Sequence, residues 1–371
     1  MANTREELGK RIASARKDRR LTQAELADAL VVDRTAITKM EAGERKVDSL
    51  ELAKLAEVLR RPAHWFVSTP QPSVVSRRAE REDAVRREDL ELETLALDVE
   101  QVVQLGGLAP MELPAFSVTS IEDSEDVAKR ARALAGLSAD EPVWDIINVV
   151  ERLGLFAFVL ALDQDVGAPA EGSYVALARG GVGLISAAGQ SGRRRFTIAH
   201  ELGHHVLADQ YAPEWVLGAG SSEREKIVNA FAIHFLMPRE AVTARWMKHE
   251  GAKDPRPAAI RIAAEFGMSW SAACAQLERL GYLTHRQYAQ LEAAVPGSVD
   301  FVEQQVVIRD DVKGPRIPSG YAAAVIRALR SHKIGPDRAT ELLHGTIDKQ
   351  DLPAPRTRSL DEMTAELGPL P

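Results

Sequence analysis

The sequence has almost no cysteine, since Cys274 is the single one among 371 residues. An internal disulfide and a cysteine-based zinc cluster are therefore excluded, which leaves His, Asp and Glu as the side chains that can hold a metal. Cys274 itself is expected to serve as a small buried hydrophobic residue.

Long apolar runs are also absent. The chain contains no stretch of 18 or more apolar residues, the length needed to cross a bilayer. The first seven residues lack the apolar core of a signal peptide. Hydrophobic residues make up 45% of the chain and charged residues 27%, a composition typical of soluble proteins. We therefore expect a cytoplasmic protein with no membrane partner, divided into two or three domains at about 150 residues each.

The chain also lacks an excess of positive charge. The formal net charge of −7 argues against a protein that coats nucleic acid. The average hides an asymmetry, because residues 1–67 hold 14 Lys/Arg against 11 Asp/Glu, a local balance of +3. The first segment is thus the mildly basic part of an acidic chain.

Short helices are predicted throughout this first segment. Thr22 and Glu25 form a capping box, Asp33 can cap the next helix, and Gly43 ends that helix. The apolar spacing places four helices over residues 6–19, 23–30, 34–42 and 49–59, with Trp65 and Phe66 closing their core. The second and third helices, joined by a tight turn, form a helix-turn-helix.

Residues 21–27 (LTQAELA) and 37–45 (ITKMEAGER) resemble the Xre/Cro-type DNA-binding family, and the resemblance covers residues 8–67. The chain departs from the family at Val31, where many members have a glycine in the turn. By this resemblance, residues of the second and third helices contact a double-stranded DNA operator. Gln23 would fix a phosphate, and the major groove would be faced by Arg34, Thr35, Thr38 and Lys39.

Arg45 and Lys46 are better placed for phosphate contacts. The alternative, that any one of these side chains belongs to a solvated helical face, stays open.

Residues 68–76, with Pro70 and Pro72, read as a linker. A charged helix is predicted next, within residues 77–105. Its apolar positions alternate at spacings of three and four, as in a short helical seam: Leu92, Leu95, Val99 and Val102. Because helix-turn-helix proteins commonly read two-fold sites as dimers, we expect a homodimer through this seam. Packing of the helix on its own chain is the alternative.

Residues 193–207 carry the pattern H-E-x-x-H within a predicted helix. His200 and His204 lie one turn apart, so both imidazoles project from one face and can bind one zinc ion, while Glu201 is placed to act as general base on water. Two histidines that share a helix by chance are the alternative. His205 points to another face and is expected to be a packing or surface residue.

A catalytic zinc needs a third protein ligand, and the predicted helix at residues 222–238 offers one. Glu225 and Asn229 lie four residues apart on one face, so Glu225 could bind the metal while Asn229 orients an imidazole. Glu223 is the competing ligand, but it lies on a different face from Asn229. We therefore favour Glu225.

A sheet is expected immediately before the histidine-bearing helix. Strands are predicted at residues 155–160, 172–177 and 182–186, with helices at 125–135 and 143–153 before them. The second and third of these strands, separated by Gly180 and Gly181, are expected to pair antiparallel. An edge strand of the sheet could hold an extended peptide over the metal by main-chain hydrogen bonds.

The two motifs RFTIAHELGH, at residues 195–204, and ExxxNxFAxxFLMP, at residues 225–238, resemble the ImmA/IrrE family of metallopeptidases. The resemblance covers about residues 120–290. It implies zinc bound by His200, His204 and Glu225, with Glu201 as general base. Another divalent metal such as manganese could also occupy a site of two histidines and one glutamate. The resemblance also implies substrates that are transcriptional repressors, cut in response to stress or mobile-element signals. Members that fuse an Xre-type domain to this peptidase fit residues 8–67.

The C-terminal part of the chain is less informative. Residues 258–266 and 269–280 are predicted as a second pair of short helices that serves packing or substrate docking. A strand is expected at residues 306–308, helices at 321–330 and 336–343, and a disordered tail from Pro353.

The sequence thus predicts an all-helical helix-turn-helix domain at residues 1–68, a linker and charged helix at 69–118, an α+β zincin-like metallopeptidase domain at 119–295, and a helical appendage with a tail at 296–371. The predicted function is a DNA-binding transcriptional regulator and zinc metalloendopeptidase, which cleaves a repressor or its own linker. The alternative is a repressor whose metal domain is a sensor or partner-binding module without proteolysis.

Overall fold

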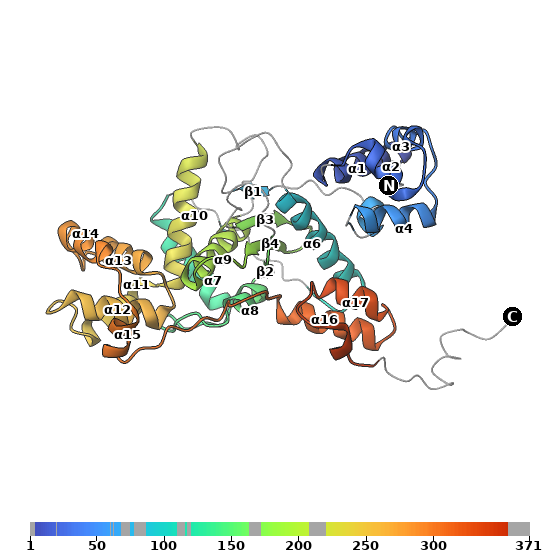
Figure 1. Cartoon of the computed structure of the whole chain (residues 1–371). Coiled ribbons are helices and arrows are strands. Elements are labelled where there is room, and N and C mark those ends of the chain that lie inside the picture. The colour runs from blue at the N-terminus through green and yellow to red at the C-terminus, as the bar shows by residue number, and fades with distance from the viewer. Residues whose placement is uncertain are drawn as a thin grey trace. The chain divides into compact units, whose positions relative to one another are not determined.

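The chain divides into two compact units (Figure 1). The computed structural model describes residues 4–19, 21–59, 61, 63–67, 75–77, 87–109, 116, 120–162, 172–207 and 220–354. Unit 1 comprises Met1–Ser73 and Glu80–Leu97, and unit 2 comprises Val74–Ala79 and Asp98–Pro371. Residues 68–74 of the linker predicted at 68–76, and residues 355–371 of the predicted tail, lie outside the described residues.

Unit 1 is helical, as predicted. Its helices are α1 (Arg5–Asp18), α2 (Gln23–Leu30), α3 (Arg34–Glu41), α4 (Ser49–Val58) and α5 (Ala63–Val67), followed by the first part of α6 (Arg87–Gln104). The capping box of Thr22 with Glu25 is present at the start of α2. The core is closed by Trp65 and Phe66, whose rings meet edge to face 5.0 Å apart. The fold of this unit is therefore the predicted helix-turn-helix.

The apolar seam of α6 is covered by its own chain. Leu92, Leu95, Val99 and Val102 are all buried in the single chain. Polar contacts accompany this packing: Trp65 donates to Glu93 within unit 1, and within unit 2 Arg338 contacts Asp98. The expected dimer contact through this seam is therefore wrong. So short a seam has the same apolar spacing whether it faces a second copy or its own chain.

In the residues that the structure describes, the sheet of unit 2 has four strands in the order β1-β3-β4-β2. They are β1 (Val75–Arg77), β2 (Leu155–Leu160), β3 (Gly172–Ala176) and β4 (Gly181–Ser186). β3 and β4 form an antiparallel hairpin, as predicted. β2 pairs with β4 in parallel, so the sheet is mixed, and the direction of β2 was not predicted from the sequence. A fully apolar strand such as β2 is buried on both faces, and its pattern carries no information on direction.

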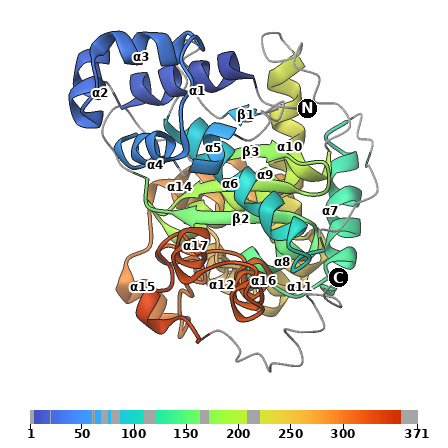
Figure 2. The ribbon, with the colours of Figure 1, turned by 90° about the vertical axis from the view of Figure 1, so that its right-hand side faces the viewer.

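Helices of unit 2 pack with the sheet around one core (Figure 2). They are α7 (Asp123–Leu134), α8 (Ile146–Arg152), α9 (Ser191–Val206) and α10 (Gly220–Leu236). The chain continues through α11 (Arg239–Lys248), α12 (Pro255–Phe266), α13 (Trp270–Arg279), α14 (His285–Ala293) and α15 (Ser298–Glu303), and then α16 (Ser319–Arg330), α17 (Pro336–Leu342) and the 3-10 turn Lys349–Asp351. The predicted second pair of helices corresponds to α12 and α13.

Two expectations about strands are wrong. Val307 and Ile308 are exposed and form no strand, because they have no neighbouring strand with which to pair in the part of the chain that the structure describes. β1 was not expected, since it lies in the segment predicted to be linker and helix. Within the described ranges, no helix has the length and apolar character needed to span a membrane.

Candidate functional site

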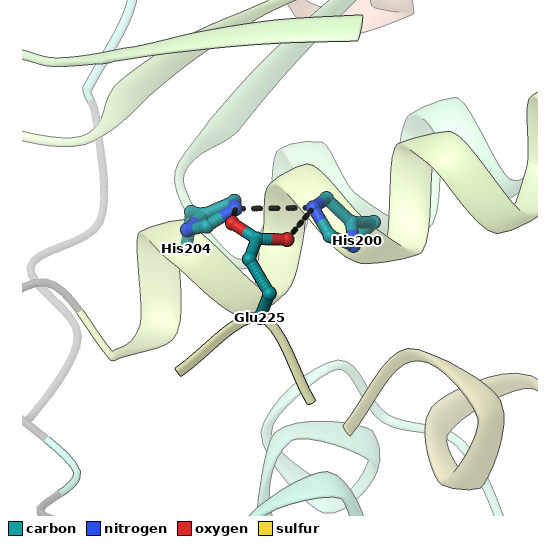
Figure 3. A group of neighbouring side chains, drawn as sticks. All are labelled: His200, His204 and Glu225. Atoms are coloured by element: carbon teal, nitrogen blue, oxygen red, sulfur yellow. Dashed lines mark hydrogen bonds and ion pairs between the residues drawn. The ribbon is translucent and has the colours of Figure 1, made fainter. Parts of the chain in front are cut away.

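Two helices bring three metal-binding side chains together (Figure 3). α9 supplies His200 and His204, and α10 supplies Glu225. The Nε2 atoms of the two histidines lie 3.1 Å apart. The Glu225 carboxylate lies across both, with Oε2 3.4 Å from Nε2 of His200 and Oε1 3.5 Å from Nε2 of His204. The three side chains predicted as ligands therefore converge on one point.

These separations fit a tetrahedral metal site. Ligand atoms that are each about 2.0–2.1 Å from a tetrahedral zinc lie about 3.3 Å from one another. The observed distances of 3.1, 3.4 and 3.5 Å are close to that value. Two imidazoles and one carboxylate also form a ligand set that zinc accepts in catalytic sites, with a fourth position left for water or substrate. The residues present therefore fit a divalent zinc ion.

Asn229 fixes the orientation of His200. The Nδ1 atom of His200 lies 3.1 Å from Oδ1 of Asn229, one turn after Glu225 on α10. An amide oxygen only accepts hydrogen bonds, so Nδ1–H donates and the Nε2 lone pair is left to bind a metal. Support of this kind sets both the tautomer and the ring direction of a ligand histidine. Asn229 thus occupies the supporting position that the sequence predicted for it.

Burial keeps His204 in its metal-binding form. Its side chain is fully buried, and this burial, together with the nearby His200 and Arg224, lowers the pKa of His204 well below its ordinary value. The imidazole is therefore neutral, and a neutral imidazole is the form that donates a lone pair. Glu223, the competing carboxylate, is brought instead to Lys226, with 3.1 Å between its Oε2 and the ammonium nitrogen.

Glu201 is buried beside the sheet rather than among the three ligands. A Cβ added to Gly172, the first residue of β3, would lie 2.6 Å from Oε1 of Glu201 and 2.5 Å from Thr197 Cγ2. Only glycine allows the strand to come this close to the carboxylate. The sequence predicted β3 but not this contact, because no spacing rule relates a strand to a residue some thirty positions later.

Two further histidines serve other contacts. His205 is buried and donates from Nε2 to the carbonyl oxygen of Leu153, while its Nδ1 accepts from the Tyr174 hydroxyl at 3.0 Å. Burial lowers the pKa of His205 to about 4, so it is a neutral packing residue. His234 faces Glu125 of α7, at 3.9 Å, and is not part of the metal group.

The start of α9 is anchored by buried arginines that sequence reasoning did not assign. Arg195 is completely buried, pairs with Asp311, donates to the carbonyl oxygen of Val143 and lies over the Trp144 ring. Arg194 pairs with Asp310, with 3.2 Å between Nη2 and Oδ2. A segment more than 100 residues later thus holds the helix that carries the histidines. The run of three arginines at residues 193–195, at the start of the predicted helix, was the signal available in the sequence.

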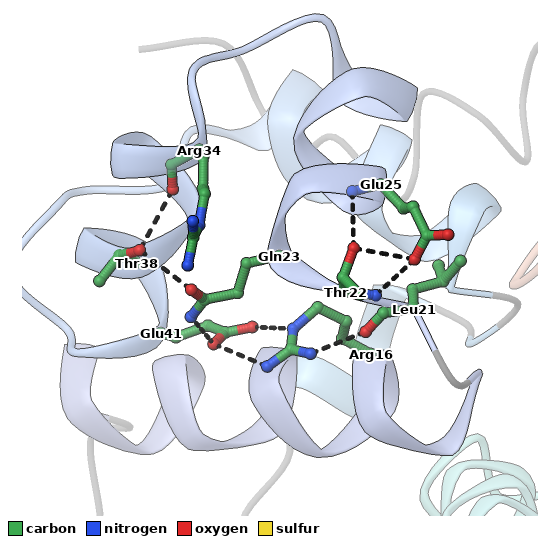
Figure 4. Close-up of polar contacts among 8 residues, drawn as sticks. All are labelled: Arg16, Leu21, Thr22, Gln23, Glu25, Arg34, Thr38 and Glu41. Carbon is green, nitrogen blue, oxygen red and sulfur yellow. Dashed lines mark hydrogen bonds and ion pairs between the residues drawn. The ribbon is translucent and has the colours of Figure 1, made fainter.

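Three of the predicted DNA-contacting residues, Gln23, Arg34 and Thr38, lie near one another in unit 1 (Figure 4). Arg34, Thr35, Thr38 and Lys39 of α3 are exposed. Gln23 is half-buried, and its amide donates to Glu41 at 2.8 Å and accepts from the Thr38 hydroxyl at 3.2 Å.

Arg45 is also half-buried, and its Nη2 lies 2.6 Å from Oε1 of Glu51. The α3 side chains are therefore open to solvent, and Thr38, Gln23 and Arg45 also have polar partners within the domain.

Comparisons with known proteins find two separate family matches, one in each part of the chain. A helix-turn-helix family model matches residues 12–66, and the model of the IrrE N-terminal-like domain, a peptidase family, matches residues 167–278. No curated protein matches the chain. Among solved structures, that of Bacillus thuringiensis PlcR in complex with the peptide PapR7 and DNA is similar at 11% identity over 91% of each chain, with a TM-score of 0.17. This TM-score is too low to show a shared fold. The chain thus carries an Xre-type helix-turn-helix domain at residues 12–66 and an IrrE-like domain at residues 167–278.

Proposed function

We propose that this DNA-binding regulator is a zinc-dependent endopeptidase that cleaves a transcriptional repressor or its own linker, in response to stress or a mobile-element signal. The convergence of His200, His204 and Glu225 within hydrogen-bond reach of one another carries this proposal. Glu201 supports it further, because a purely structural metal site needs no carboxylate beside its first histidine.

His200, His204 and Glu225 would hold zinc, with manganese as the alternative metal. Zinc bound there would supply a Lewis acid that lowers the pKa of water and polarises a peptide carbonyl. Glu201 takes the proton from the attacking water and then delivers it to the leaving amine nitrogen. Because Glu201 is buried against Gly172 and Thr197, its carboxylate is held in place rather than mobile. Asn229 keeps His200 in the tautomer that the metal requires.

The substrate class follows from the two domains. β3 runs past Glu201, so an extended peptide paired with β3 would pass close to the general base. The helix-turn-helix would tether this site to a double-stranded DNA operator, through Arg34, Thr35, Thr38 and Lys39 in the major groove and Gln23 and Arg45 at phosphates. A transcription factor bound nearby is the first substrate to test.

The experiment compares the wild-type chain with Glu201→Gln. Each is loaded with zinc, mixed with operator DNA and the repressors encoded beside it, and sampled over time by gel and intact mass. We expect Glu201→Gln to keep its metal and to cleave at least 100-fold more slowly, which lies within the contribution of a general base.

An unchanged cleavage rate in Glu201→Gln would refute the assigned base. DNA binding without cleavage by the wild type, under any inducing condition, would select the alternative regulator in which the metal domain is a sensor or partner-binding module. Chelation is the matched control, because it should stop cleavage in the wild type and be reversed by added zinc.

A further inference from the structure

A short segment from far away in the chain completes the sheet beside the candidate active site. β1, Val75–Arg77, pairs antiparallel with β3, and the partners are Val75 with Val175, Ser76 with Tyr174, and Arg77 with Ser173. Nearly 100 residues separate the two strands in sequence. The segment lies between the helix-turn-helix and α6, but by its contacts it belongs to unit 2.

Among the described strands, β1 occupies the side of β3 that does not pair with β4, which is where a peptide could pair with β3. In the strand order β1-β3-β4-β2, the other side of β3 is hydrogen-bonded to β4. Without β1, β3 would be an edge strand with open N–H and C=O groups, which is the kind of surface that extended peptides recognise. A peptide substrate and β1 therefore compete for one set of hydrogen-bonding groups.

The occupied edge belongs to the strand whose first residue contacts Glu201. The register runs from Val175 towards Gly172, so that Arg77 lies opposite Ser173, one residue from the glycine in contact with the Glu201 carboxylate. The backbone of β1 thus heads towards the general base, as the backbone of a bound substrate would. Three residues supply few main-chain hydrogen bonds, so a longer extended segment would have more of them and could displace β1.

We propose that Val75–Arg77 is an intrinsic competitor that occupies the peptide-binding edge of β3 and must leave before a protein substrate can bind. The proposal rests on the proposed peptidase function. The partner that fits this edge is an unfolded or extended protein segment, which is recognised mainly through its backbone. The fraction of molecules in which β1 has left β3 then determines how much of the enzyme can bind substrate.

The test removes the pairing with prolines. Alternate residues of a strand direct their N–H towards a given neighbour, so Val75→Pro/Ser76→Pro removes at least one donor to β3 whichever residue has it. The matched control is Val307→Pro/Ile308→Pro, in an exposed segment outside any strand. Circular dichroism checks that each full-length variant is folded.

Two measurements report whether β1 covers the edge of β3, and neither depends on catalysis. Within residues 173–175, hydrogen exchange of the amides that point towards β1 should become at least tenfold faster in Val75→Pro/Ser76→Pro and stay unchanged in the control. A labelled peptide with the sequence of residues 72–79, PSVVSRRA, should bind this variant at least tenfold more tightly than it binds the wild type. The same peptide with prolines at positions 75 and 76 should not bind. Unchanged exchange together with equal peptide affinity would overturn the proposal.

Cross-strand cysteines provide a second test that does not depend on the proline variant folding. Opposite residues in antiparallel strands alternate between two spacings, and a disulfide accepts the closer one, so Ser76→Cys/Tyr174→Cys and Arg77→Cys/Ser173→Cys cover both. Cys274 is buried and should not interfere. One pair should form a disulfide that abolishes peptide binding, with recovery on reduction. Failure of both pairs to oxidise would contradict the pairing.

All of these measurements are also made in the Glu201→Gln background. If the chain proves not to be a peptidase, exchange and peptide binding still report whether β1 covers β3. If the chain is a peptidase and β1 is not a competitor, Glu201→Gln loses cleavage, while Val75→Pro/Ser76→Pro cleaves no faster than the wild type.

Discussion

At the scale of single residues, the hydrogen bond from His200 to Asn229 is the smallest part of the site that can be tested. Asn229→Leu keeps the side-chain volume but removes the acceptor at 3.1 Å from Nδ1. Loss of such a supporting contact typically weakens metal binding by about 10–100-fold. We expect that loss in zinc affinity, measured by competition with a chelator.

Asn229→Asp is the matched variant, since it retains an acceptor in the same place. It should bind zinc much more tightly than Asn229→Leu. Equal zinc affinities for Asn229→Leu and the wild type would show that Asn229 does not position the ligand.

Val31 is a second residue that can be tested alone. It ends α2 with φ 57° and ψ 49°, in the left-handed region that disfavours β-branched side chains. Its side chain is 88% exposed, so little packing is lost on replacement. Val31→Gly should therefore stabilise the helix-turn-helix unit by about 1 kcal/mol, measured by calorimetry or by hydrogen exchange in α2 and α3.

Val32→Gly is the control, because Val32 is half-buried and its φ is not positive. It should lower stability. Destabilisation by both substitutions to the same extent would contradict the strain assigned to Val31.

At the scale of secondary-structure elements, the closeness of β3 to α9 decides where Glu201 lies. In Gly172→Ala, the new Cβ would overlap Oε1 of Glu201 and Cγ2 of Thr197, so the carboxylate must move. We expect a cost of about 1–3 kcal/mol in stability. Cleavage should fall by at least tenfold while zinc stays bound, as measured by rate and metal content.

Gly183→Ala on the neighbouring strand provides the comparison. A Cβ at Gly183 would meet nothing closer than 3.5 Å, which is ordinary contact. Its activity should remain near the wild-type value. If both alanine variants behave alike, the contact between Gly172 and Glu201 does not position the base.

The helices α6 and α17 are joined by a buried ion pair. Asp98 is almost completely buried, and Oδ1 lies 2.5 Å from Nη2 of Arg338, with His344 3.3 Å from Oδ2. Removing one partner of such a pair leaves a buried charge and commonly costs about 3 kcal/mol. Arg338→Met should therefore lower the free energy of unfolding by about that amount.

The double variant Asp98→Leu/Arg338→Met removes both charges. It should be clearly more stable than Arg338→Met alone, as measured by urea denaturation. Additive losses from the two single variants would mean that the pair is not coupled.

At the scale of the whole molecule, local signals predicted most of the elements. Capping residues and apolar spacing gave α1 to α4, because these depend on residues three or four apart. The metal group was predictable for the same reason: His200 with His204, and Glu225 with Asn229, are each pairs on one face of one helix.

What the sequence did not predict depends on contacts between distant segments. The direction of β2, the addition of β1 to β3, and the approach of Gly172 to Glu201 all join parts of the chain without a shared periodicity. The seam of α6 was predicted as apolar but assigned to a second copy, because an apolar face does not specify what covers it.

The central claim is that the chain has one metal centre with a separate general base. Its most direct test is metal content by mass spectrometry, on chain purified without a metal-affinity step and equilibrated with zinc. We predict one zinc per wild-type chain and per Glu201→Gln chain, and a much lower content in His204→Ala and in Glu225→Ala. Wild-type chain without zinc, or equal zinc in all four proteins, would contradict it.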